Sequence, residues 1–398
     1  MRNKITINVI SVILKSLLSL FLFSTITELT TPTQYAPYGA ALVFLGLLTT
    51  VGSIGFGPAI IRSPEFSNLK VNTFASYSLL LGAALSFVLI FLSSYIESLM
   101  NIQGLRFFIF YICPVAFVKL ISIVYESVSQ RRLDIKKITI IDFFSFFIGH
   151  FLGQIFVLKM GLDLIYLVLC VFIEELLKLI FYKLNSRVKF FWSFGIKNIK
   201  DDLFFSGTLT FNRVLNYLNS QLDKIYVSNQ VTAIDFAGYS RVFQFVNYPI
   251  NIIGQLFDKI LYPIICENIR ESNGYSYLKS SMYVFLLGVL GSTFCYLISD
   301  YIEVLFFKGE WSDYMEIYYI LLCVIPIRLV DRFSSIMLNA INKPWVRTIS
   351  QLVFISTLIA GLSLYDFPKI NVVAIISVAS YGMSAFISIF YLVFIYEK

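Results

Sequence analysis

Long apolar runs, separated by short polar segments, follow one another along the whole chain. A bilayer core of roughly 30 Å needs about 20 apolar residues per helix. Twelve runs meet this length, and they occupy residues 6–28, 37–61, 73–98, 105–128, 137–158, 162–183, 203–227, 235–264, 277–299, 314–340, 347–365 and 370–395. Because lipid offers no hydrogen-bond partner to the backbone, each run is predicted to be a transmembrane helix.

Composition supports a membrane protein with little outside the bilayer. Of 398 residues, 58% are hydrophobic and only 14% are charged, whereas soluble domains carry about 25% charged residues. The net charge of +7 does not indicate nucleic-acid binding, because the basic residues lie in short loops between apolar runs. The five cysteines form no C-x-x-C pair, and the single His150 lies in an apolar run. No metal site and no cofactor are predicted.

Loop charge predicts the orientation. Eighteen Lys and Arg residues fall in the loops and ends on one side of the twelve runs, and four fall on the other. Positively charged loops stay in the cytoplasm, so both termini are expected there. The basic start followed by the run 6–28 resembles a signal peptide, but the run is long enough to span and is interpreted as a retained first helix.

A basic loop at about residues 184–202 divides the runs into two sets of six. The predicted fold is therefore an all-α integral membrane protein of two six-helix bundles, residues 1–190 and 191–398. Six helices return the chain to the side where it began, so the two bundles would be related by a pseudo-two-fold axis along the membrane normal. The aromatic segment 189–192 of this loop would lie along the anionic leaflet, or it is a solvated linker.

Nine basic residues fall inside the predicted helices or near their ends, and such residues usually face a partner or a wet cavity. Several have acidic neighbours in the sequence and are interpreted first as ion pairs or as end residues that reach the interface. Lys15 and Arg213 lie near the middle of the first and seventh helices with no acidic residue within one turn. Facing each other between the bundles, they would bind an anion, and phosphate suits both. Arg62 and Arg241 would extend this cationic route.

The seventh and eighth helices also carry a polar stripe that includes Asn216 and Asp223. Spacings of three and four residues place many of these side chains on one face. The stripe would line water or a sugar, or it would make hydrogen bonds between helices. Asn216 and Asp223 therefore join the candidate substrate-binding residues.

Three segments in this order carry a family resemblance: GSIGFGPAIIR at residues 52–62, NSQLDKI at 219–225 and LFFKGEW at 305–311. Together they resemble the Wzx-type polysaccharide flippases of the MATE-like exporter superfamily. The resemblance implies translocation of undecaprenyl-pyrophosphate-linked oligosaccharide from the cytoplasmic to the periplasmic leaflet of a bacterial inner membrane, by alternating access through a cationic cavity. Its product would serve O-antigen lipopolysaccharide, capsule or exopolysaccharide.

The same resemblance implies the partners and leaves alternatives open. The expected partners are the lipid-linked oligosaccharide, membrane lipids, a polysaccharide polymerase and a chain-length regulator. There is no nucleotide-binding P-loop in the sequence, so energy would come from a gradient, with Na⁺ or H⁺ as candidate coupling ion. A transporter rather than an enzyme is expected. The alternatives are a cation-coupled drug antiporter of the same superfamily and a membrane polysaccharide polymerase or ligase.

Overall fold

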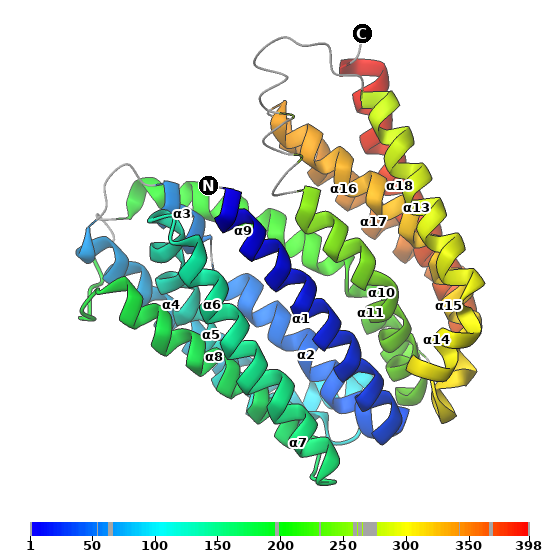
Figure 1. Cartoon of the computed structure of the whole chain (residues 1–398), viewed down its shortest axis with the longest axis horizontal. Coiled ribbons are helices and arrows are strands. Elements are labelled where there is room, and N and C mark those ends of the chain that lie inside the picture. Colours follow the sequence, from blue (N-terminus) through cyan, green and yellow to red (C-terminus); the bar gives the residue numbers. More distant parts are fainter. Residues whose placement is uncertain are drawn as a thin grey trace. The chain divides into compact units, whose positions relative to one another are not determined.

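The computed structural model of the chain (Figure 1) describes residues 2–53, 55–62, 67–195, 199–230, 232–257, 261, 265, 277–341, 343–365 and 369–396. Helices dominate these residues, and no strand occurs among them, which confirms the predicted all-α class. Contacts divide the chain into two compact units, Met1–Tyr217 and Leu218–Lys398. The predicted division at residue 190 stays a prediction.

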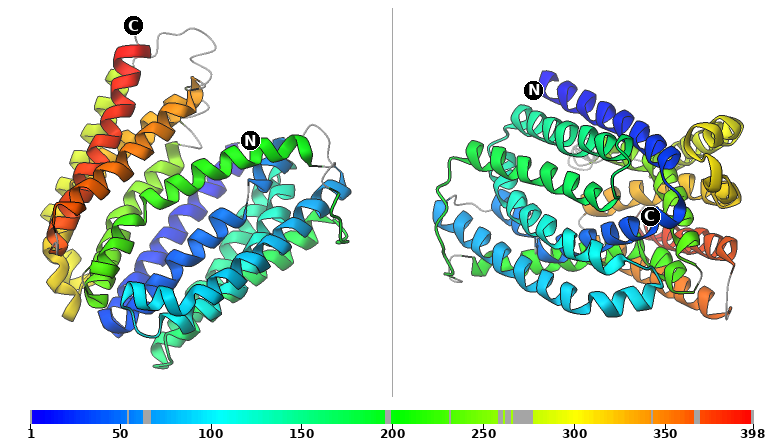
Figure 2. Two further views of the ribbon diagram at one scale, coloured as in Figure 1. Left: turned by 180° about the vertical axis from the view of Figure 1, so that it is seen from behind. Right: turned by 90° about the horizontal axis from the view of Figure 1, so that it is seen from below.

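The first unit consists of long helices that run roughly side by side (Figure 2). They are α1 (Arg2–Leu29), α2 (Pro32–Gly52), α3 (Phe56–Arg62), α4 (Asn68–Met100), α5 (Leu105–Arg131), α6 (Ile135–Ser145), the π-helix η1 (Phe146–Leu152), α7 (Gly153–Lys159), α8 (Ile165–Ser186) and most of α9 (Lys200–Asn219). Helix α5 packs against α2, α3, α4 and α8 and so occupies the middle of this unit.

The second unit contains α10 (Leu222–Gln230), α11 (Ala233–Leu256), α13 (Tyr277–Leu297), α14 (Ser299–Phe306), the 3-10 helix η4 (Gly309–Tyr314), α15 (Met315–Leu322), α16 (Val324–Ala340), α17 (Pro344–Ser363), α18 (Ile370–Tyr391) and the π-helix η5 (Leu392–Tyr396). Helix α16 packs against α11, α13, α17 and α18. The core around it includes Phe257, Tyr277 and Phe333, with the Tyr277 and Phe333 rings stacked at 5.7 Å.

Every predicted span contains a described helix. Within the described part of the chain, eight helical segments are long and apolar enough to cross a membrane, and they begin at residues 10, 32, 68, 105, 135, 277, 345 and 370. The other four predicted spans correspond to α8, to α9 with α10, to α11 and to α15 with α16.

Local signals explain where several helices begin and bend. Thr31 caps α2 with a reciprocal pair of bonds to Gln34, and Pro32 occupies the first turn. The second predicted span is broken between α2 and α3, where Gly55 adopts a left-handed φ of 60°. Arg131, at the end of α5, donates a hydrogen bond of 2.7 Å to the carbonyl oxygen of Ile60 near the end of α3.

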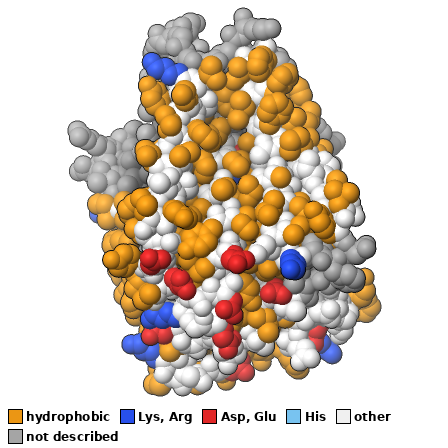
Figure 3. All heavy atoms as spheres, turned by 90° about the vertical axis from the view of Figure 1, so that its right-hand side faces the viewer, with side chains coloured by type: hydrophobic (Ala, Val, Ile, Leu, Met, Phe, Trp, Pro, Cys, Tyr) orange, Lys and Arg blue, Asp and Glu red, His pale blue; other side chains and the backbone are white. Residues whose placement is uncertain are grey.

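The outer surface is apolar in the way that lipid requires. Phe87 and Phe91 on α4 are 72% and 79% exposed, and Leu290 on α13 is 71% exposed. Figure 3 shows one face on which hydrophobic side chains dominate while most acidic side chains gather toward one end. Such large exposed apolar patches belong in contact with a membrane.

Residues 188–194, which we call the strap, form an extended segment after α8 that is hydrogen-bonded to α4. Asn72 donates its side-chain amide to the carbonyl oxygen of Lys189 at 3.0 Å, and the Ser193 amide donates to the Ser76 hydroxyl at 3.0 Å. Tyr77 donates to the carbonyl oxygen of Phe194 at 3.1 Å. The strap is thus a folded part of the first unit.

Candidate functional site

Buried charges collect in the first unit around the middle of α8. We call Lys119, His150, Glu174, Glu175 and Lys178 the α8 charge cluster. The Lys178 ammonium lies 2.6 Å from a Glu174 carboxylate oxygen and 3.2 Å from one of Glu175. The His150 Nδ1 lies 3.0 Å from Glu174, and the Lys119 ammonium lies 3.5 Å from Glu175. These pairs offset the cost of keeping charges away from water.

The sequence builds this cluster by helical spacing and by one close approach. Glu174, Glu175 and Lys178 are three and four residues apart on α8, so their side chains share a face. His150 comes from η1, whose π-helical turn interrupts the run between α6 and α7. A Cβ atom on the neighbouring Gly149 would lie 2.4 Å from the Glu174 backbone nitrogen, so glycine is what lets η1 approach α8.

Replacing Gly149 with alanine should therefore push η1 away from α8. We expect a loss of about 1–3 kcal/mol of stability, the usual cost of overpacking, read as a lower unfolding temperature in detergent. Gly291→Ala is the matched control, because nothing lies within 4 Å of a Cβ atom there. Equal unfolding temperatures for the two variants would contradict the close approach.

Lys15 on α1 lies beside this cluster. Its ammonium is 5.3 Å from the centroid of the Phe146 ring, and that ring stacks on the His150 imidazole at 5.3 Å with an angle of 19°. Asp142 and Glu174 are close enough to interact electrostatically with Lys15. Lys15 is partly buried and makes a cation–π contact.

The other cationic candidates have different surroundings. Helix α3 ends at Arg62, whose side chain lies outside the described residues. Arg213 and Asn216 lie on α9, and both side chains are exposed within the described structure. Their neighbour Tyr217 donates a short hydrogen bond to the carbonyl oxygen of Val43, which joins the end of α9 to α2. Whether Lys15 and Arg213 share one site stays a prediction.

Asp223 lies in a polar core of the second unit. It is fully buried, and it accepts a hydrogen bond of 2.7 Å from the Tyr239 hydroxyl, which also lies 3.2 Å from the Ser377 hydroxyl. Lys224 donates to the side-chain oxygen of Gln221 at 3.0 Å and lies 4.6 Å from the centroid of Phe243. These contacts connect α10, α11 and α18.

Basic side chains from α11 and α16 lie in the same unit. The Arg328 guanidinium lies 4.9 Å from the centroid of the Tyr381 ring and donates a short hydrogen bond to the Asn247 side chain. Arg241 is buried, and it donates to the Gln244 side-chain oxygen at 3.4 Å. The second unit thus contains cation–π contacts, which stabilise basic side chains where little water reaches them.

Several pairs of charged and polar side chains in the structure could not be predicted from the sequence. Asp331 pairs at 2.5 Å with Arg347 on α17, although Arg332 is its neighbour in sequence. Tyr182 donates to Asp142 at 2.6 Å across α8 and α6. The sequence signals such pairs only by a charged residue within an apolar run. This signal does not identify the residue with which the charge pairs.

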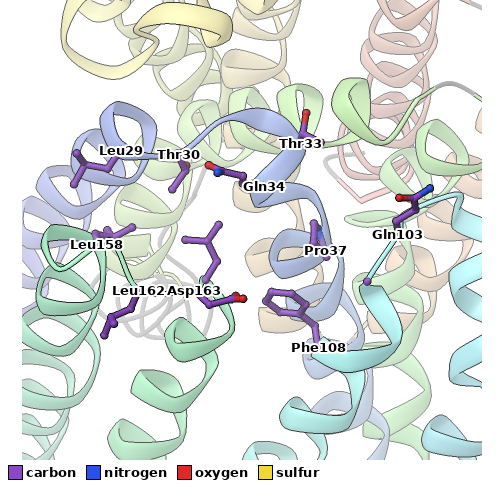
Figure 4. A pocket seen from close by; sticks show the side chains of 13 residues that line it. Leu29, Thr30, Thr33, Gln34, Pro37, Gln103, Phe108, Leu158, Leu162 and Asp163 are labelled. Atoms are coloured by element: carbon purple, nitrogen blue, oxygen red, sulfur yellow. The ribbon is translucent and has the colours of Figure 1, made fainter.

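A pocket of about 510 Å³ opens at one end of the first unit (Figure 4). It lies where α1 meets α2, α4 meets α5 and α7 meets α8. Gln34, Gln103 and Asp163 supply polar side chains, and Phe108 and Pro37 supply apolar ones. A mixed lining of this kind is typical of small-molecule sites, although no residue of the predicted site contributes to it.

Solved structures with similar folds are transporters. The lipid II flippase MurJ in an inward closed conformation matches with a TM-score of 0.74, 15% identity, and coverage of 96% of this chain and 86% of that one. An inward-facing multidrug resistance MATE family transporter of the MOP superfamily matches with a TM-score of 0.69, 15% identity, and coverage of 95% and 93%. These proteins are transporters and flippases rather than enzymes, as expected for this chain.

Two curated relatives match part of the chain. The teichuronic acid biosynthesis protein TuaB of Bacillus subtilis (strain 168) is 24% identical over 229 residues, which are 55% of this chain and 46% of TuaB. An uncharacterized membrane protein in the cps region of Klebsiella pneumoniae is 23% identical over 311 residues, which are 75% and 62% of the two chains. The matches thus span about half to three fifths of these relatives.

A protein-family match agrees with the membrane helices, the buried charges and these similar structures. Residues 26–316 match the family described as "Polysaccharide biosynthesis protein". That stretch covers all of the α8 charge cluster and Asp223 with its partner Tyr239, whereas Lys15 and Ser377 lie outside it. The chain is therefore a multi-pass membrane protein that belongs to the polysaccharide biosynthesis protein family, and its fold is similar to those of a MATE family transporter and the lipid II flippase MurJ.

Proposed function

We propose that this chain flips an undecaprenyl-pyrophosphate-linked oligosaccharide from the cytoplasmic to the periplasmic leaflet of a bacterial inner membrane. Family membership supports a role in polysaccharide biosynthesis, and the fold likeness to a lipid II flippase is compatible with a lipid-linked substrate. The O-antigen, capsule or exopolysaccharide pathway would use the product.

The observation that carries this proposal is Lys15. It lies inside the apolar span Ile10–Leu29, where a lysine costs roughly 2.5–3.5 kcal/mol on insertion scales. Its ammonium rests on an aromatic ring within a neighbourhood of opposing charges. A visiting diphosphate would give this cation a stronger partner than an aromatic ring does.

Translocation of this substrate requires only a polar path across the membrane. Its apolar tail remains in lipid, while the diphosphate and glycan need polar surroundings on the way across. No bond is made or broken, so a cation that binds the diphosphate and then releases it is sufficient. Energy would come from a Na⁺ or H⁺ gradient, the membrane potential or the substrate gradient. Arg62, Arg213 and Arg241, with Asn216 and Asp223, remain the further candidate substrate ligands.

The orientation and partners belong to the same proposal. Both termini would face the cytoplasm, because the loop charges on that side outnumber the others by eighteen to four. The two bundles would alternate access around an axis along the membrane normal. A polysaccharide polymerase and a chain-length regulator would receive the product at the periplasmic side.

Deleting the gene in its host tests this function. We expect loss of the surface polysaccharide and accumulation of lipid-linked repeat units on the cytoplasmic leaflet, both restored by the wild-type gene. Normal polysaccharide with altered drug tolerance would instead indicate the antiporter. Single unpolymerised units on the outside would indicate the polymerase or ligase. The pairing of Glu174 and Glu175 with basic side chains already weakens the antiporter alternative.

A further inference from the structure

One aromatic ring joins the lysine and the histidine of the first unit. The Phe146 ring, which is buried, holds the Lys15 ammonium 5.3 Å from its centroid and stacks on the His150 imidazole at a centroid distance of 5.3 Å. A protonated imidazole and an ammonium on one ring repel each other and compete for the same electron density. A positive charge on His150 would therefore act on Lys15.

Charged groups lie around η1 on three of the helices packed against it, while α7 bears only the exposed Lys159 at its end. Helix α1 contributes Lys15, α6 contributes Asp142, and α8 contributes Glu174, Glu175 and Lys178. Behind these, α5 contributes two more, and among the described residues the charged groups of this neighbourhood are Lys15, Lys119, Glu126, Asp142, Glu174, Glu175 and Lys178. Three are basic and four are acidic. With His150 neutral, the neighbourhood therefore carries no net positive charge.

We infer that protonation of His150 sets how tightly the Lys15 region holds an anionic headgroup. A proton on His150 neutralises its partner Glu174, which lies 3.0 Å away, and leaves Lys15 with a more positive environment. An anion should then bind more tightly. By linkage, a bound anion makes protonation of His150 easier to the same extent.

This inference rests on the proposed function only in naming the headgroup as the diphosphate of a lipid-linked sugar. It adds a control of headgroup binding to that function. Uptake of a proton at His150 strengthens binding of the headgroup, and loss of the proton favours its release.

The chain has one histidine, so its imidazole signal can be assigned without ambiguity. We would label histidine with ¹⁵N in the full-length protein in lipid nanodiscs and follow its NMR signal with pH. Lys15→Met removes a neighbouring cation, so the titration midpoint of His150 should move to higher pH by about 0.5–1 unit. Lys159→Met, at an exposed position at the end of α7, should leave it in place. Lys15→Arg should stay near the wild type.

This first measurement uses no ligand, so it can fail or succeed whatever the protein transports. An unchanged midpoint in Lys15→Met, with the variant folded and His150 titrating, would overturn the inference and leave the flippase proposal intact.

A second measurement uses inorganic pyrophosphate as the probe. We expect its binding to tighten about five- to tenfold from pH 8 to pH 6 beyond the change seen in His150→Asn, which absorbs the titration of pyrophosphate itself. Equal pH dependence in the wild type and His150→Asn would also overturn the inference. Loss of polysaccharide in the deletion strain would then still support flipping.

Discussion

Replacing Lys15 with alanine should slow translocation of the lipid-linked sugar about tenfold to a hundredfold. A charge-assisted hydrogen bond contributes roughly 1.5–3 kcal/mol, and each 1.4 kcal/mol is about a factor of ten. The protein should remain in the membrane at normal abundance, since alanine is an excellent helix former and replaces a costly intramembrane charge. The measurement is the rate of flipping in proteoliposomes, with surface polysaccharide in the complemented deletion strain as a second readout.

Two further variants make the result specific to the charge at Lys15. Lys15→Arg keeps a cation and should retain most of the rate. Lys159→Ala removes an exposed lysine from the same unit and should behave as the wild type. If Lys15→Ala flips lipid at the wild-type rate, Lys15 is a structural residue and the cationic route is lost as an explanation.

Replacing Lys178 with methionine should have the largest effect on folding. The Lys178 ammonium contacts the carboxylates of Glu174 and Glu175, which are both buried. Removing one partner of a buried charged pair costs about 3–5 kcal/mol, because the remaining charge has lost its compensation. We expect a lower unfolding temperature and reduced yield of the purified protein in detergent.

The same substitution at Lys183 provides the control. Lys183 lies on the same helix, and its side chain is exposed, so Lys183→Met should change the unfolding temperature little. Glu174→Gln combined with Lys178→Met should unfold at a higher temperature than Lys178→Met alone, because one uncompensated carboxylate has been removed. A single variant as stable as Lys183→Met would show that the α8 charge cluster contributes little to the fold.

The succession of helices could be predicted from hydrophobic runs, because span length in a bilayer is set by the thickness of the hydrocarbon core. Interruptions inside the runs could not. The break at Gly55 and the π-helical turn at His150 depend on packing with other helices, and both lie within runs that are predominantly apolar. The pattern of apolar residues is the same whether such a run is straight or bent.

The candidate site was predictable only as a set of residue types. Lys15 was recognisable because a lysine within an apolar span is costly. Its neighbours Phe146 and His150 were not, since they lie more than a hundred residues away in the chain and look like ordinary members of another span. Likewise, Asp223 is adjacent to Lys224 in sequence, but the structure gives it a hydrogen bond from Tyr239.

The strap bears on how the protein could be produced as two co-expressed fragments. A fragment that ended before Lys189 would lack the backbone carbonyl groups to which Asn72 and Tyr77 donate, and it would leave those side chains without these hydrogen bonds. A fragment that continued past Phe194 would keep them satisfied. Reassembly of a working protein from two pieces should therefore depend on which side of the strap the chain is cut.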